Sequence, residues 1–272
     1  VIAESDGEFL IFTYADAVRA ADSINVRFSD GTKIAGTVRQ IDEVLGMAVV
    51  AVPSGNLPEE ERKKVQVLSI ANSYTVKAGD VLVGIGGQTG QVQSLSFGTV
   101  SYVARNVQIT DGLTRILYAD ISSNSQTGTF LINTAGEMVG WTSESCRSES
   151  CTDRTAAYTI SSYKPILERL TNGASAAYLG ILGQDVSRAM QGSGIPAGVY
   201  VTEAVSGSPA YDAGIQPGDI IVKFGTKEIG SFKDLQAQIE NSASGASVSV
   251  NVMRKGRDGY TEIPFLVSLR AR

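Results

Sequence analysis

The chain has 272 residues, which is too long for one small core and fits two domains. Hydrophobic residues make up 43% and charged residues 19%, as in an ordinary globular protein, and 29 glycines between short apolar runs favour strands joined by turns. The net charge of −5 gives a surface that repels phosphate backbones, so we expect no nucleic-acid partner.

The chain opens on a strand-like segment, VIAESDGEFLIFTY at residues 1–14, with no basic region before it. No apolar run in the sequence approaches the ~20 residues that are needed to span a bilayer. We therefore interpret the sequence as part of a longer chain, and we expect any secretion signal or membrane anchor to lie upstream.

Closely spaced alternating segments fill the first half of the chain and predict an antiparallel barrel or sandwich. Residues 57–64, LPEEERKK, predict a short helix or a solvated loop. The expected strands are 8–14, 23–31 with a turn at Asp30-Gly31, 33–42, 46–52, 80–87, 94–107 and 114–121, followed by a strand, a tight turn and a strand at 130–141.

Residues 163–173, YKPILERLTNG, predict a helix between the two halves of the chain. Ile166, Leu167 and Leu170 share one face, and Asn172-Gly173 is a typical helix end. We place the domain boundary there, with one domain at 1–172 and the other at 173–272.

The second half of the chain mixes strands with helices. A short helix is expected around Ala210 to Ala213, and residues 231–243 predict an amphipathic helix with Phe232, Leu235 and Ile239 on one face. The expected strands are 177–186, segments within 198–229, 247–256 and 260–269.

Two cysteines, Cys146 and Cys151, stand in a polar stretch that we expect to be exposed. A disulfide between them would close a surface loop, add about 2 kcal/mol on the loop-entropy model, and imply an oxidising, extracytoplasmic location. The alternative is a pair of free surface thiols, which we disfavour because exposed thiols are reactive. Two sulfurs without any histidine fall short of four zinc ligands, so we expect neither a metal nor another cofactor.

The stretch SGSPAYDAGIQPGDIIVKFGTKEI, residues 206–229, closely resembles the signature of a PDZ domain, which has an α+β fold. The resemblance implies a carboxylate-binding loop in the sequence YLGI. Successive backbone N–H groups around a glycine can form a nest for an anionic chain terminus, and the strand that follows can accept a peptide by β-augmentation. Leu235 and Ile239 would line the pocket for the terminal side chain, a role that is compatible with being core residues. The expected loop residues are Tyr178, Leu179, Gly180 and Ile181.

A trypsin-like double β-barrel followed by a helix and a PDZ domain is the architecture of the HtrA (DegP-like) serine proteases, which nearly the whole chain resembles. The resemblance implies a mostly β fold and suggests a trimeric assembly. It is carried by residues 9–52, by FGTVSYVAR at 97–105, by NTAGEMVGW at 133–141 and by AAYTISSYKPILERL at 156–170.

The same resemblance implies positions for a Ser-His-Asp triad. The family's histidine falls at Asp16, its aspartate at Gly46 and its serine at Thr127, and the chain contains no histidine at all. The loop that begins at Asp120 departs from the family's length, which leaves the register at Thr127 open by one residue. We therefore expect no intact catalytic residues at these positions.

Loss of a serine–histidine unit removes most of the acceleration in a comparable protease, on the order of 10⁶-fold. Thr127 is a hydroxyl nucleophile that needs a base, and a carboxylate is a weak base for an alkanol. The sequence therefore predicts a catalytically inactive HtrA-like pseudoprotease.

We expect this protein to bind peptide C-termini, unfolded protein or partner proteins through its PDZ domain. The expected location is the cell envelope or the outside of the cell, where it would serve protein quality control or regulate an active protease. Two alternatives stay open. One is a serine-type endopeptidase with residual activity from an altered nucleophile, and the other is a structural subunit of a trimer.

Overall fold

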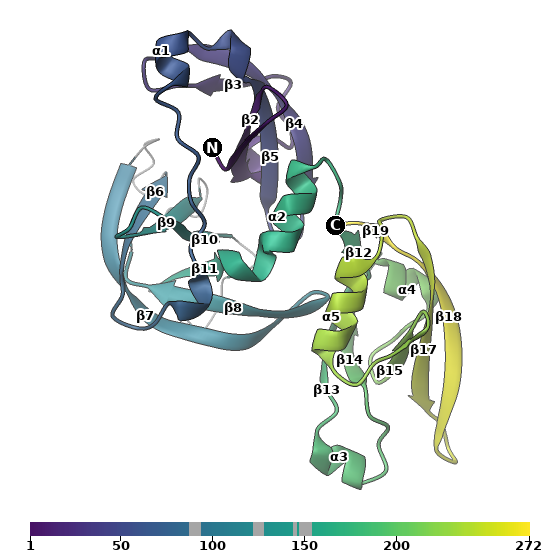
Figure 1. Ribbon diagram of the computed structural model, residues 1–272. Helices are drawn as coiled ribbons and strands as arrows, with labels where there is room; N and C mark the ends of the chain where they lie inside the picture. Colours follow the sequence, from purple (N-terminus) through teal and green to yellow (C-terminus); the bar gives the residue numbers. More distant parts are fainter. Residues whose placement is uncertain (87–93, 122–127, 144–145, 147–153) are drawn as a thin grey trace. The chain divides into compact units, whose positions relative to one another are not determined.

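A computed structural model describes residues 1–86, 94–121, 128–143, 146 and 154–272 (Figure 1). The chain divides into two compact units: unit 1 comprises Val1–Arg105 and Arg115–Ala174, and unit 2 comprises Asn106–Thr114 and Ser175–Arg272. Strands supply most of the regular structure, so the predicted mostly β class is confirmed. Among the residues described, no helix is both long enough and apolar enough to cross a membrane.

The first part of unit 1 is an antiparallel sheet with the strand order β1-β2-β5-β4-β3. β5 is buried from Met47 to Val52, and it lies between β2 and β4, which cover its two edges. The charged stretch 57–64 contains a short helix, α1 (Glu59–Arg62), as predicted. The strands are β1 (Ala3–Ser5), β2 (Glu8–Tyr14), β3 (Ile24–Arg27), β4 (Lys33–Asp42) and β5 (Met47–Pro53).

The second part of unit 1 is a closed antiparallel barrel with the strand order β10-β11-β8-β7-β6-β9. Its core contains Leu82, Leu117, Leu131 and Val139. The predicted tight turn between β9 and β10 is confirmed, and the Asn133 Oδ1 atom accepts the N–H groups of the turn. The strands are β6 (Val81–Gly86), β7 (Ser94–Ile109), β8 (Gly112–Ala119), β9 (Thr129–Asn133), β10 (Met138–Thr142) and β11 (Thr155–Thr159).

The predicted helix between the two halves of the chain is α2 (Lys164–Thr171), which packs against β4 and β5 (Figure 1). Its apolar face is buried through Ile166, Leu167 and Leu170, as the spacing predicts. α2 therefore belongs to unit 1.

Unit 2 is built on a sheet with the strand order β13-β14-β15-β17-β18, in which β16 pairs with β15. Both predicted helices, α4 and α5, are present, and α5 buries Phe232, Leu235 and Ile239. The short helix α3 and the strand pair β12–β19 were not predicted. The elements are β12 (Ala177–Tyr178), β13 (Ile181–Asp185), α3 (Arg188–Gly192), β14 (Val199–Ala204), α4 (Pro209–Ala213), β15 (Ile220–Phe224), β16 (Lys227–Glu228), α5 (Phe232–Asn241), β17 (Ser247–Lys255), β18 (Tyr260–Ser268) and β19 (Arg270–Ala271).

Candidate functional site

Asp16, the position at which a general base is expected, lies on the surface of unit 1. It stands in a short 3-10 helix, Ala15–Ala17, directly after β2. Its side chain is 70% exposed, and its carboxylate lies 3.1 Å from the Arg19 guanidinium. Arg19 also contacts Glu43. Asp16 is therefore part of an exposed group of ion pairs.

Gly46, the position expected for the orienting carboxylate, lies beside the Asp16 segment. The Gly46 carbonyl accepts the N–H of Ala15 at 3.1 Å, so the backbone brings these two positions together. The turn that contains Gly46 begins at Asp42, a buried carboxylate whose Oδ1 accepts the Leu45 N–H at 2.9 Å. This carboxylate holds the turn in place.

Thr127, the expected nucleophile position, lies outside the described residues, but its neighbour Gly128 is described. Gly128 has a φ of +68°, and a Cβ atom placed on it would lie 2.1 Å from the Tyr14 ring. The ring of Tyr14 therefore packs directly on the backbone beside the nucleophile position. Burial raises the pKa of the Tyr14 phenol above its ordinary value, so this group stays protonated at neutral pH and cannot accept a proton.

Aromatic rings continue from Tyr14 into the interior of unit 1. The Phe130 ring lies 4.9 Å from the Tyr14 ring and 5.3 Å from the Phe12 ring. Trp141, which is fully buried, lies 5.5 Å from Phe12 and 5.4 Å from Tyr158. We did not single out Tyr14 in the sequence, although strand alternation places it on the same face as Phe12. Large apolar rings thus fill this part of the scaffold.

The predicted carboxylate-binding loop of unit 2 has the geometry of an anion site. The N–H groups of Leu179, Gly180 and Ile181 converge on one carboxylate, that of Asp111, at distances of 2.8, 2.7 and 3.0 Å. Burial raises the pKa of the Asp111 carboxyl above its ordinary value, although these N–H groups and the charge of Arg272 favour the ionised form.

The loop is held in this conformation by the cap of helix α4. Ser208, which is 1% exposed, donates to the Gly180 carbonyl at 3.1 Å and accepts the Tyr211 N–H at 3.2 Å. Gly180 has a φ of +87°, and a Cβ atom there would lie 2.1 Å from the Ser208 Cβ. Only glycine therefore fits this position without displacing its neighbours.

The remaining predicted peptide-binding residues lie in elements beside this loop. Tyr178 is half-buried in β12, where it pairs with Arg270. Leu235 and Ile239 are 0% and 2% exposed and belong to the core of unit 2. Their core role is therefore confirmed, and their role in lining a peptide pocket stays a prediction.

Asp111 was not predicted as a site residue. It lies in the turn between β7 and β8 with a φ of 64°, is 3% exposed, and donates its own N–H to the Ile181 carbonyl at 2.8 Å. The dipeptide Asp111-Gly112 between two apolar, β-branched runs is a common hairpin signal and would have located the turn. It would not have shown what the turn contacts.

The expected exposure of the cysteines is wrong for Cys146, which is 2% exposed. Its Sγ atom lies 2.9 Å from the Ser143 carbonyl and 3.2 Å from the Ala156 carbonyl, so it packs inward as a small apolar group with a weak S–H donor. Cys151 lies outside the described residues, and the disulfide stays a prediction.

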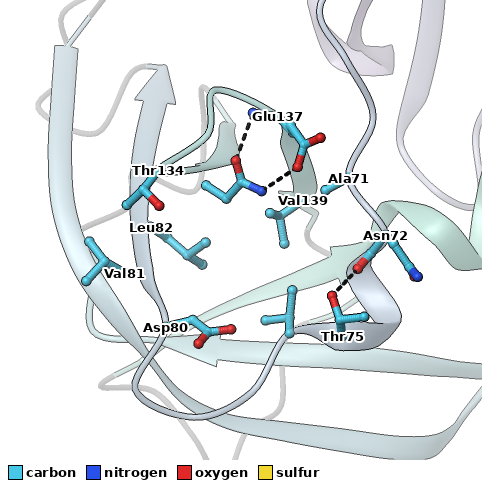
Figure 2. A pocket seen from close by; sticks show the side chains of 11 residues that line it. Ala71, Asn72, Thr75, Asp80, Val81, Leu82, Thr134, Glu137 and Val139 are labelled. Atoms are coloured by element: carbon cyan, nitrogen blue, oxygen red, sulfur yellow. Dashed lines mark hydrogen bonds between the residues drawn. The ribbon is translucent and has the colours of Figure 1, made fainter.

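A cavity of about 410 Å³ opens beside the barrel (Figure 2). Polar groups at its wall form hydrogen bonds with one another. The Asn133 Nδ2 donates to Glu137 at 2.8 Å, and the Thr75 hydroxyl donates to the Asn72 carbonyl at 2.8 Å. Asp80, also at the wall, accepts the Lys77 N–H at 3.0 Å. These polar groups hold local structure, and none of the predicted site residues that the structure describes lines this cavity.

Two family models match the chain: a trypsin-like peptidase domain over residues 1–140 and a PDZ domain over residues 177–264. Relatives include a probable periplasmic serine endoprotease, DegP-like, of Hahella chejuensis, which is 30% identical over 94% of this chain and 54% of its own length. The serine protease Do-like HtrA of Bacillus subtilis is 26% identical over 95% of this chain and 60% of its own length. The chain thus spans little more than half the length of these relatives.

The fold is similar to that of a solved structure of the HtrA-type protease AlgW with a tripeptide. The TM-score is 0.64 at 22% identity, over all of this chain and 88% of that one. The family models, the relatives and this fold agree with the architecture that the sequence predicts. The chain belongs to the HtrA-type family of trypsin-like serine proteases that carry a PDZ domain.

Proposed function

We propose that this protein binds the C-termini of polypeptides through a PDZ domain at residues 173–272. The observation that carries the proposal is the convergence of three backbone N–H groups, those of Leu179, Gly180 and Ile181, on one carboxylate. A free chain terminus offers the same two oxygens. Strand β13, which follows the loop, lies at the end of the described strand order, where a peptide can add as a further strand.

We further propose that the trypsin-like domain, residues 1–172, has lost its protease chemistry. Support comes from the absence of histidine from the chain and from the assignment of Asp16, Gly46 and Thr127 to the triad positions. The exposed ion pairs of Asp16 and the protonated Tyr14 beside Gly128 agree with this assignment. The protein would then act as a binding partner of proteins rather than as an enzyme.

A location outside the cytoplasm fits this function. Several relatives are named as periplasmic proteases, and the proposed Cys146–Cys151 disulfide would need an oxidising compartment. There the protein would bind unfolded polypeptides, assemble as a trimer, or regulate an active protease.

The test of the proposed function is the binding of fluorescein-labelled decapeptides that differ in their last residue, followed by fluorescence anisotropy. Each peptide is made as a free acid and as a C-terminal amide. We expect at least one free acid to bind, with its amide at least about tenfold weaker, because the amide cannot ionise and loses charge-assisted bonds to the loop. Equal binding of acids and amides would contradict a carboxylate-binding site.

A second candidate function is a serine-type endopeptidase with an altered nucleophile, which the names of the relatives favour. It requires Thr127 and a base within hydrogen-bond reach. The two candidates separate in a fluorogenic casein assay. We expect wild type and Thr127→Ala to match the protein-free blank, whereas turnover in wild type that disappears in Thr127→Ala would establish the endopeptidase.

A further inference from the structure

The carboxylate-binding loop of unit 2 already holds a ligand from the same chain. Oδ1 of Asp111 accepts the N–H groups of Gly180 and Ile181, and Oδ2 accepts that of Leu179. All three successive backbone N–H groups of the loop therefore donate to Asp111. Each N–H group has a single hydrogen, so these donors cannot fully bind Asp111 and a peptide terminus at once.

The rest of the hairpin, Asn106–Thr114, also takes up positions that a peptide would need. The Asp111 N–H donates to the carbonyl of Ile181, the first residue of β13, as an added strand would. The Leu113 N–H donates to the Gln236 side chain of helix α5 at 3.0 Å, and the Leu113 side chain packs on the core cluster that includes Leu235 and Ile239.

A third contact lies further along the hairpin, where the Gln108 side chain donates to the Thr202 hydroxyl on β14 at 3.1 Å. The hairpin thus contacts the loop, the helix α5 and the sheet of unit 2, and all these contacts lie within this unit. A buried carboxylate, an apolar side chain and a strand-type hydrogen bond are the three features by which a peptide C-terminus is recognised.

We propose that the Asn106–Thr114 hairpin is a built-in competitor of peptide C-termini, and that the loop accepts a peptide only after Asp111 has left it. This inference rests on the proposed function, because it concerns the occupant of the same site. Peptide affinity is then set by the fraction of molecules in which the hairpin is undocked, since the apparent Kd is the intrinsic Kd divided by that fraction. Any event that undocks the hairpin would switch peptide binding on.

The test compares the full chain with its Asp111→Ala variant, using the labelled decapeptides as free acids and as amides. Removal of the carboxylate frees three donors, so we expect the variant to bind free acids at least about tenfold more tightly than wild type. The amides should gain little. Asp111→Asn keeps the shape but places an NH₂ group against an N–H donor, so we expect a smaller gain.

Two further variants keep the test decisive. Leu113→Ala loosens the hairpin without touching the three donors, and it should also raise the affinity for free acids. Asp258→Ala removes one charge from the exposed β17–β18 turn and should leave the affinity unchanged. Circular dichroism and thermal unfolding establish that each variant is folded. If Asp111→Ala does not fold, the affinity of Leu113→Ala for free acids decides whether the hairpin competes with peptides.

The outcomes separate the inference from the proposed function. Higher affinity for free acids in Asp111→Ala and Leu113→Ala supports the competitor role. Equal affinity in wild type and variants, with free acids preferred over amides, would overturn the inference and leave the proposed function intact, and Asp111 would then only fasten the hairpin. No binding of any free acid, even by a folded Asp111→Ala protein, would remove the proposed function and the inference with it.

Discussion

The two regions where the sequence predicts chemistry differ in what builds them. At the positions predicted for the triad in unit 1 the chemistry would depend on side chains. The structure has an exposed Asp16 and a Gly46 at two of them, and a partly buried Tyr14 ring packs on Gly128, next to the third. In the loop of unit 2 the binding groups are backbone N–H groups of residues 179 to 181, and they all point at one carboxylate. A site made of backbone persists as long as the fold and one glycine persist, whereas a side-chain site is lost by a few substitutions.

The largest effect is expected from replacing the glycine of the backbone site, Gly180, because the loop's conformation depends on it. Gly180→Ala forces a left-handed conformation on alanine and places its Cβ 2.1 Å from the Ser208 Cβ. Left-handed strain costs about 1–2 kcal/mol and overpacking about 1–3 kcal/mol, so we expect the free energy of unfolding to fall by about 4 kcal/mol, with loss of peptide binding. Urea denaturation followed by circular dichroism measures the fall.

Gly207→Ala is the matched control, because Gly207 also has a positive φ, +72°, but no atom lies within 4 Å of the added Cβ. We expect it to cost only the strain, about 1 kcal/mol, and to keep binding. Equal effects of the two substitutions would mean that the Gly180–Ser208 contact does not hold the loop.

A smaller effect is expected from the packing of the Tyr14 ring on Gly128, next to the predicted nucleophile position. Gly128→Ala places a Cβ atom 2.1 Å from the Tyr14 ring, in a left-handed backbone conformation, and should lower the free energy of unfolding by about 3 kcal/mol. If the ring is the obstacle, Gly128→Ala should cost about 1–2 kcal/mol less in a Tyr14→Ala background. The double-mutant cycle is measured by urea denaturation, and strict additivity would show that the ring does not fill this space.

The smallest effect is expected at Asp16. Its carboxylate is exposed and contacts an exposed arginine, so Asp16→Ala should leave the urea midpoint and peptide binding unchanged. The measurement is the same unfolding curve, recorded beside wild type. A clear loss of peptide binding would give Asp16 a role that its surface position does not suggest.

The sequence predicted those parts of the fold that depend on local periodicity and turn chemistry. Buried runs such as Met47–Val52 became central strands, and the spacing of Phe232, Leu235 and Ile239 became the buried face of α5. The PDZ signature drew attention to the loop at residues 178 to 181, whose N–H groups converge on the Asp111 carboxylate, while its role in binding peptides stays a prediction. These features follow from residues that are close together in the chain.

Features that depend on distant residues could not be predicted in the same way. Cys146 stands among polar residues in the sequence, but in the structure it is buried and its Sγ atom packs against the carbonyls of residues 143 and 156. The Tyr14–Gly128 contact and the Asp111–Gly180 contact join residues that are far apart in the chain, and no local pattern encodes such pairing. The sequence around Asp111 predicts its local role in a turn, but not its contact with the distant loop.

The assignment of Asn106–Thr114 to unit 2 makes this unit discontinuous in the sequence. A fragment that begins at Ser175 would carry the loop but lack its internal partner, so its affinity for peptides would overstate that of the whole chain. The hairpin is also synthesised before the loop that it contacts. During translation, unit 2 can finish folding only when a segment made earlier is still free to join it, which links the assembly of this unit to the order of synthesis.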